Sequence, residues 1–96
     1  MNTDDRIEIV MSLLRSGTER SLGIARKYAE SCERGARNRT NCGAHPLAEL
    51  WRSIASATFA ACHLGTGKTT GQRAMLAIRA IVEARARYRA ETARVN

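Results

Sequence analysis

The sequence lacks the long apolar runs, the export signal and the paired cysteines that mark membrane and secreted proteins. Its longest weakly polar run, residues 54–64, is far shorter than the ~20 residues needed to span a bilayer. The acidic opening MNTDDRIE has neither the basic nor the apolar part of an export signal. Three scattered cysteines, an odd number, favour reduced thiols over disulfides. We therefore expect a cytoplasmic protein that does not bind membranes.

Aromatic residues and groupings typical of active sites are also few. Only 4% of the residues are aromatic, which argues against single-stranded nucleic acid being held by base stacking. The pattern brings no acid, base and nucleophile together, and 96 residues build one modest core rather than a deep cleft. We expect one helical domain over residues 1–96 that is not an enzyme and holds no cofactor.

Residues 46–65 form the clearest helical pattern, because apolar side chains recur there at spacings of three and four. Pro46 suits a first helical turn, and Gly65 suits the left-handed position after a helix end. Trp51 and Phe59 are the largest apolar groups, so we expect this helix to hold the centre of the core. Its apolar stripe consists of Leu47, Leu50, Trp51, Ile54, Ala55, Thr58, Phe59 and Cys62.

The segment before this central helix is helical too, but its continuity is open. Ser16 and Glu19 have the spacing of a capping box that starts a second helix, whereas Gly17 alone would only soften a continuous one. We favour a continuous or kinked helix to about Arg37, followed by a loop over residues 38–44. The apolar face of the segment begins with Ile7, Val10, Met11 and Leu14.

A last helix is predicted from about Thr70 to beyond Arg89, since Thr69 and Gln72 have capping-box spacing. No stretch of the chain alternates as a strand would. The sequence thus predicts an all-α fold, a small antiparallel bundle of three helices, or of four if the first region breaks. The expected buried face of the last helix consists of Ala74, Met75, Ile78, Ile81 and Val82.

One glycine-rich segment resembles a phosphate-binding motif without completing it. Residues 65–70, GTGKTT, read like the end of a P-loop. Cys62 stands where the first glycine of that motif belongs, and a predicted helix rather than a strand precedes it. We therefore interpret the segment as a helix connection in which Lys68 is at most a weak anion ligand.

Two further binding patterns are incomplete. The potential zinc ligands are Cys32, Cys42, His45, Cys62 and His63. Only Cys42 and His45 stand at chelating spacing, so we expect no metal site. Residues 21–41 match the first helix of a helix-turn-helix but not the second, because Gly35 and Asn38 stand where that helix needs apolar residues.

Charge is the strongest functional signal in the sequence. Sixteen basic residues, 14 of them arginine, face 9 acidic ones, and the net charge of +7 favours an anionic partner. In the last helix, Arg85 and Arg89 wind into the apolar stripe. Because unpaired arginines do not stay in a core, either this helix extends into water or its arginines meet acidic groups of a partner. A third alternative is that they are buried and paired within the chain, with Glu8, Glu19 or Glu49.

These arginines lead to two hypotheses of function. The first is nucleic-acid binding through arginine–phosphate hydrogen bonds, made by Arg85, Arg87, Arg89 and Arg94 with help from Arg34, Arg37 and Arg39. The second is a regulator or inhibitor that docks on an acidic surface of a host protein, in the manner of bacterial, plasmid or phage accessory proteins. A homodimer is a further expectation, because the second half of the last helix has few apolar partners in its own chain.

Overall fold

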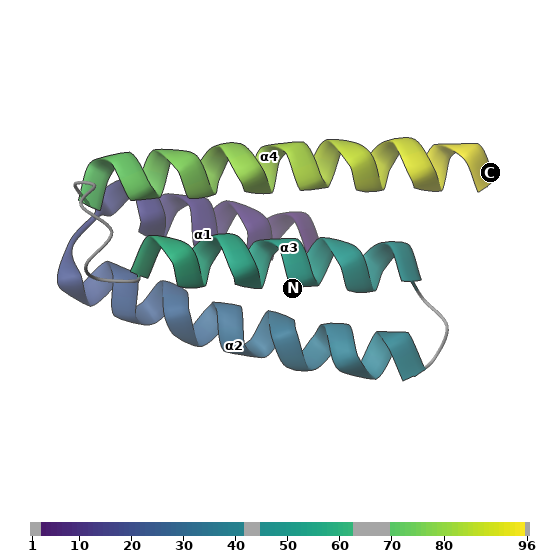
Figure 1. Ribbon diagram of the computed structural model, residues 1–96, viewed down its shortest axis with the longest axis horizontal. Helices are drawn as coiled ribbons and strands as arrows, with labels where there is room; N and C mark the ends of the chain where they lie inside the picture. Colours follow the sequence, from purple (N-terminus) through teal and green to yellow (C-terminus); the bar gives the residue numbers. More distant parts are fainter. Residues whose placement is uncertain (1–2, 42–44, 63–69, 96) are drawn as a thin grey trace.

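The computed structural model describes residues 3–41, 45–62 and 70–95 and arranges them as an antiparallel bundle of four helices (Figure 1). These helices are α1 (Thr3–Ser16), α2 (Glu19–Asn41), α3 (His45–Cys62) and α4 (Thr70–Val95). None of the described residues lies in a strand. The predicted all-α bundle is confirmed, in its four-helix form. Within the described ranges, every helix is too short or too polar to cross a membrane.

The chain breaks between α1 and α2, so the continuous first helix that we favoured is wrong. Gly17 adopts a φ of 65°, a left-handed conformation that ends α1 and that other residues rarely adopt. Thr18 then caps α2, because its N–H donates to Ser21 Oγ and the Ser21 N–H donates to Thr18 Oγ1, each over 3.0 Å. This is a capping box two residues after the predicted one. Ser16 instead donates its hydroxyl to the Ser12 carbonyl.

The predicted loop over residues 38–44 is wrong in its first half, because α2 continues to Asn41. Asn38 and its neighbours have modest helix propensity, but propensity is a weak signal beside the packing of the helix on its neighbour. Residues 42–44 lie outside the described residues. Helix α3 begins one residue before Pro46, which therefore occupies the first turn as predicted.

Helix α3 is the centre of the bundle, as its apolar pattern predicted. It packs against α2 on one side and α4 on the other, so it lies between them. Trp51 is only 3% exposed, and the guanidinium of Arg6 lies 5.7 Å from its ring centroid. Phe59 is only partly buried. The buried Thr58 hydroxyl donates to the Ile54 carbonyl over 2.7 Å, which satisfies it within its own helix.

The buried face of α4 differs from the predicted one. Met75 is 60% exposed and Val82 is 43% exposed, so including them was wrong. Alanines are buried instead where α4 packs on its neighbours, because small side chains let two helices approach closely. The prediction from the sequence pattern gave more weight to the larger apolar residues. The residues of α4 that are buried are Ala74, Ala77, Ile78, Ile81 and Ala84.

Candidate nucleic-acid interface

Two of the predicted phosphate ligands form ion pairs within the chain. Arg85 Nη1 lies 2.9 Å from Glu8 Oε1, and Arg89 Nη2 lies 3.2 Å from Asp4 Oδ1. The Arg85 side chain is only 18% exposed. The acidic groups that meet these arginines belong to α1 of the same chain, which is the third alternative above; Glu8 was among the acids named there, whereas Asp4 was not.

The two pairs form a ladder between antiparallel helices. Asp4 and Glu8 are four residues apart on α1, and Arg85 and Arg89 are four residues apart on α4, so each pair of side chains shares one helix face. Each carboxylate satisfies part of the hydrogen-bonding capacity of a guanidinium that a phosphate would otherwise use. The second half of α4 is therefore a weaker candidate for phosphate binding than its arginine content indicates.

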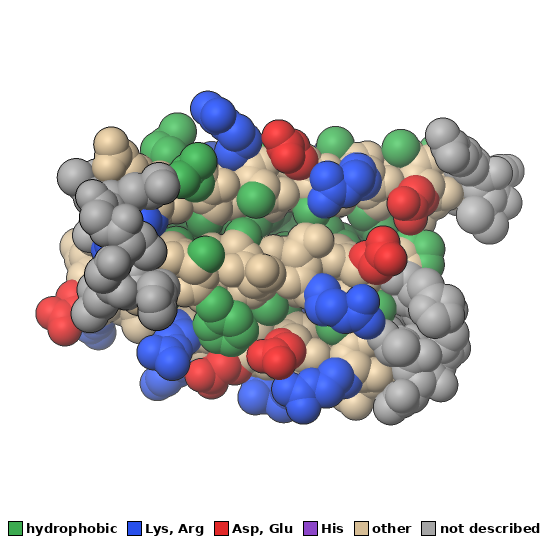
Figure 2. Space-filling view, in the orientation of Figure 1, with side chains coloured by type: hydrophobic (Ala, Val, Ile, Leu, Met, Phe, Trp, Pro, Cys, Tyr) green, Lys and Arg blue, Asp and Glu red, His purple; other side chains and the backbone are tan. Residues whose placement is uncertain are grey.

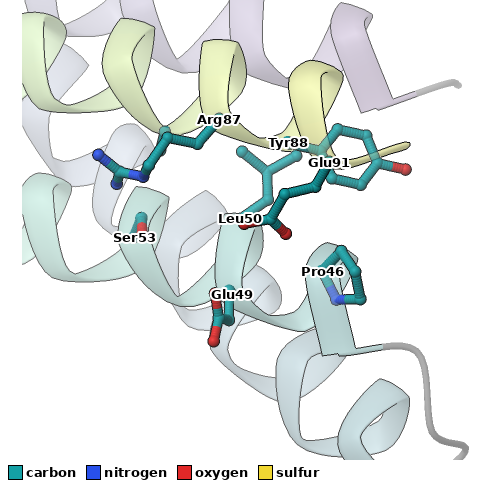
Figure 3. Close-up of a pocket in the computed structure, with 8 residues that line it drawn as sticks. Pro46, Glu49, Leu50, Ser53, Arg87, Tyr88 and Glu91 are labelled. Carbon is teal, nitrogen blue, oxygen red and sulfur yellow. The ribbon is translucent and has the colours of Figure 1, made fainter. Parts of the chain in front are cut away.

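The other predicted ligands are spread over the molecule. Arg87 is exposed on α4, where it lies over Ser53 of α3 and points away from Glu91 (Figure 3). Arg37 pairs with Glu33 one turn earlier on α2, at 3.1 Å. Arg34 is exposed on the same helix. Helix α3 separates Arg34 and Arg37 from Arg87, so the predicted residues do not form one surface. Lys68 and the side chains of Arg39 and Arg94 lie outside the described residues.

A row of three cations runs along α2, with the exposed Glu30 between the second and the third on the same side of the helix, and the sequence reasoning missed two of the three cations. Arg20, Lys27 and Arg34 are spaced by seven residues, which places them on one line of the helix two turns apart. All three are exposed, and the structure shows no ion pair between them and any other described residue. We call these three residues the α2 cationic stripe. Their heptad spacing was the signal in the sequence that pointed to it.

The rest of the surface mixes charges of both signs. Figure 2 shows lysine and arginine side chains alternating with carboxylates over α3 and α4, with no extended basic area on that face. Helix α3 contains one acidic and one basic residue, Glu49 and Arg52. On α4, Glu83 and Glu91 stand among the arginines. Among the four helices, α2 therefore offers the clearest row of accessible positive charge.

A hollow of about 380 Å³ lies beside the first turns of α2. Burial raises the pKa of the Cys62 thiol there, and the positive charges of Arg26 and Arg73 oppose this with smaller effects. Cys62 donates to the Leu22 carbonyl over 3.5 Å, and Arg73 Nε donates to the Ala61 carbonyl over 3.2 Å. A thiol kept neutral in this way is a poor nucleophile. The hollow is lined by Gly17, Glu19, Leu22, Gly23, Arg26, Cys62 and Arg73.

Cys32, the other cysteine among the described residues, is a poor nucleophile as well. Burial raises the pKa of the Cys32 thiol to about 11, against a smaller opposing effect of Arg6. Among the described residues, no three side chains of the metal-binding types lie together. Cys42, His63 and the side chain of His45 lie outside the described part of the chain. Residues 21–41 form one uninterrupted helix, so they are not a helix-turn-helix.

The fold and surface thus define a small all-α bundle with one cationic helix face. Comparison of the chain with protein-family models, with curated proteins and with solved structures finds no match. Any statement of function therefore depends on the chemistry of the surface.

Proposed function

We propose that this protein is a non-enzymatic nucleic-acid-binding bundle that contacts the phosphate backbone of a duplex through the α2 cationic stripe. The observation that carries the proposal is the row of Arg20, Lys27 and Arg34, which is exposed and without ion-pair partners among the described residues. Arginine and lysine bind phosphate oxygens through charge-assisted hydrogen bonds.

The length of the stripe suits a duplex. Fourteen residues of helix rise by about 21 Å between Arg20 and Arg34, which is close to the rise of about six base pairs. Gly23 lies exposed next to the stripe, and nothing stands within 4 Å of the place where its Cβ would be. The absence of a side chain there lets a phosphate backbone approach the helix closely. Phosphate contacts alone carry no base information, so we expect binding with little sequence preference.

The salt dependence of binding tests the proposal. Three phosphate contacts predict a slope of about −2.7 for the logarithm of affinity against the logarithm of salt concentration. The Lys27→Gln/Arg34→Gln variant removes two contacts, so its slope is expected near −0.9. A matched control, Arg15→Gln/Arg79→Gln, changes the net charge equally at exposed cations of α1 and α4 and is expected to keep the slope of the unmodified chain. Equal losses in both variants would show a general charge effect and remove the α2 stripe from the proposal.

The alternative function is a regulator that uses the same stripe on an acidic protein surface. For binding to a shape-matched protein partner, a rise in salt lowers mainly the association rate constant, and much of the affinity remains. Fluorescence anisotropy measures the affinity for a duplex of about 20 base pairs across a salt series, and it separates nucleic-acid binding from binding to a protein surface. A duplex that does not bind at low salt would leave the protein partner as the better explanation.

A further inference from the structure

We propose that α4 is also the interface of a homodimer, in which it packs antiparallel against α4 of a second copy. The contact surface is the outward side of α4, defined by Leu76, Ala80, Glu83, Arg87 and Ala90, which we call the α4 outer stripe. These residues follow one another at alternating spacings of four and three, as the contact positions of paired helices do. All five are exposed, and Leu76 is 50% exposed.

Four of the five residues of the stripe, all but Leu76, match one another when the stripe is read in reverse. In an antiparallel pair, Glu83 faces the partner's Arg87, and Arg87 faces the partner's Glu83. Ala80 and the partner's Ala90 then lie at the same level on each side of this charged centre. A two-fold interface requires this property, because both copies contribute the same patch.

Glu83 and Arg87 have no other ion-pair partner in the described parts of the chain. They are one turn apart on α4, but the Arg87 side chain lies over α3 (Figure 3). Exposed charges of both signs side by side, with alanine on either side, suit a helix that approaches closely and offers the reverse pattern. The stripe carries one charge of each sign in an order that its own reverse matches, so a second copy of this chain is a better occupant than a phosphate backbone.

The surface beside the stripe has room for the partner. A shallow groove of about 530 Å³ runs between α3 and α4, lined on α4 by Ala80, Glu83 and Arg87. On α3 it is bordered by Arg52 and by four small side chains, Ser53, Ser56, Ala57 and Ala60. Side chains of the second copy can therefore lie against α3 as well as α4, which enlarges the contact beyond a single pair of helices.

The dimer does not depend on the proposed function. Helix α2, which carries the cationic stripe, lies on the far side of α3 from α4 (Figure 1), so pairing through α4 leaves the stripe uncovered. Two α2 stripes in one dimer would raise the apparent affinity for a long duplex through multivalency. Because the two surfaces are separate, either proposal can fail while the other stands.

Sedimentation equilibrium of the full chain at about 10–100 µM tests the interface, because a dimer with a micromolar dissociation constant is populated at these concentrations. The unmodified chain is expected to show a dimer. Glu83→Arg and Arg87→Glu each place like charges against each other across the two-fold axis, so each is expected to weaken association at least about tenfold. The double variant Glu83→Arg/Arg87→Glu restores opposite charges and is expected to associate within about threefold of the unmodified chain.

Far-UV circular dichroism of each variant checks that the bundle stays folded, since both positions are exposed. A monomer at the highest concentration of the unmodified chain overturns the proposal. So does a pair of single variants that associate as well as the unmodified chain. A double variant that remains monomeric while folded would show that these two residues do not face each other across the interface.

Discussion

Helices α2 and α4 each contain six basic residues, yet the fold treats their charges differently. On α2 three cations line up on one exposed face without ion-pair partners in the described residues. On α4 two arginines are neutralised by carboxylates of α1. The difference shows that the number of arginines in a helix does not locate a binding face, because a neighbouring helix can neutralise them.

The helix responsible is the shortest of the four. Helix α1 has 14 residues and carries Asp4, Asp5 and Glu8 in its first half. Acidic residues in a first turn are also favoured by the helix dipole, so local stability and pairing with α4 select the same side chains. A face of α4 that reads as cationic in the sequence is therefore closer to neutral in the folded chain.

The largest expected effect is on the free energy of unfolding and concerns the core around α3, the helix that lies between α2 and α4. Trp51→Ala is expected to lower the free energy of unfolding by about 3–5 kcal/mol, because the side chain is 3% exposed and its removal leaves a cavity. Chemical denaturation followed by circular dichroism measures this. Met75→Ala, at a position that is 60% exposed, serves as the control and is expected to cost less than about 0.5 kcal/mol. A cost for Trp51→Ala below about 1 kcal/mol would contradict the central place of α3.

The next effect tests the neutralisation of α4 directly. Arg85→Glu sets a carboxylate against Glu8 in a half-buried position, so we expect a loss of about 1–3 kcal/mol in the free energy of unfolding. Arg89→Glu, whose pair with Asp4 is exposed, is expected to cost less than about 1 kcal/mol. Exchanging the charges in Glu8→Arg/Arg85→Glu should recover part of the first loss in the same denaturation experiment. Equal costs at both arginines would mean that burial of the pair with Glu8 contributes nothing.

The smallest effects compare two glycines on either side of the start of α2. Gly17→Ala is expected to destabilise the bundle by about 1–2 kcal/mol, because alanine is strained at a φ of 65°. Gly23→Ala is expected to stabilise it by about 0.5–1 kcal/mol, since the added methyl group meets nothing and alanine favours helix. Thermal unfolding of both variants measures the difference in sign. Stabilisation by Gly17→Ala would show that the break between α1 and α2 is not needed.

Much of the architecture was predictable from local patterns. The apolar face of α1, the position of Pro46 in the first turn of α3 and the burial of Trp51 all follow from the spacing of residues along one helix. Such spacing depends only on the geometry of the helix, so it can be read without knowing what the helix packs against. The all-α class and the antiparallel order of the helices follow from the same information.

The sequence by itself determined where helices form and which of them is most apolar, but only the tertiary structure decided which charges remain available. Ser16 and Thr18 are both plausible caps, and the left-handed Gly17 selects the second. Arg85 and Glu8 are 77 residues apart in the chain, and no local pattern links them. Their pairing depends on the orientation of α1 and α4 about their own axes, which the packing of the buried alanines of α4 fixes. That orientation decides which side chains of the two helices meet. The α2 cationic stripe stays exposed for the same reason, since the described parts of the other helices leave its three side chains in contact with water.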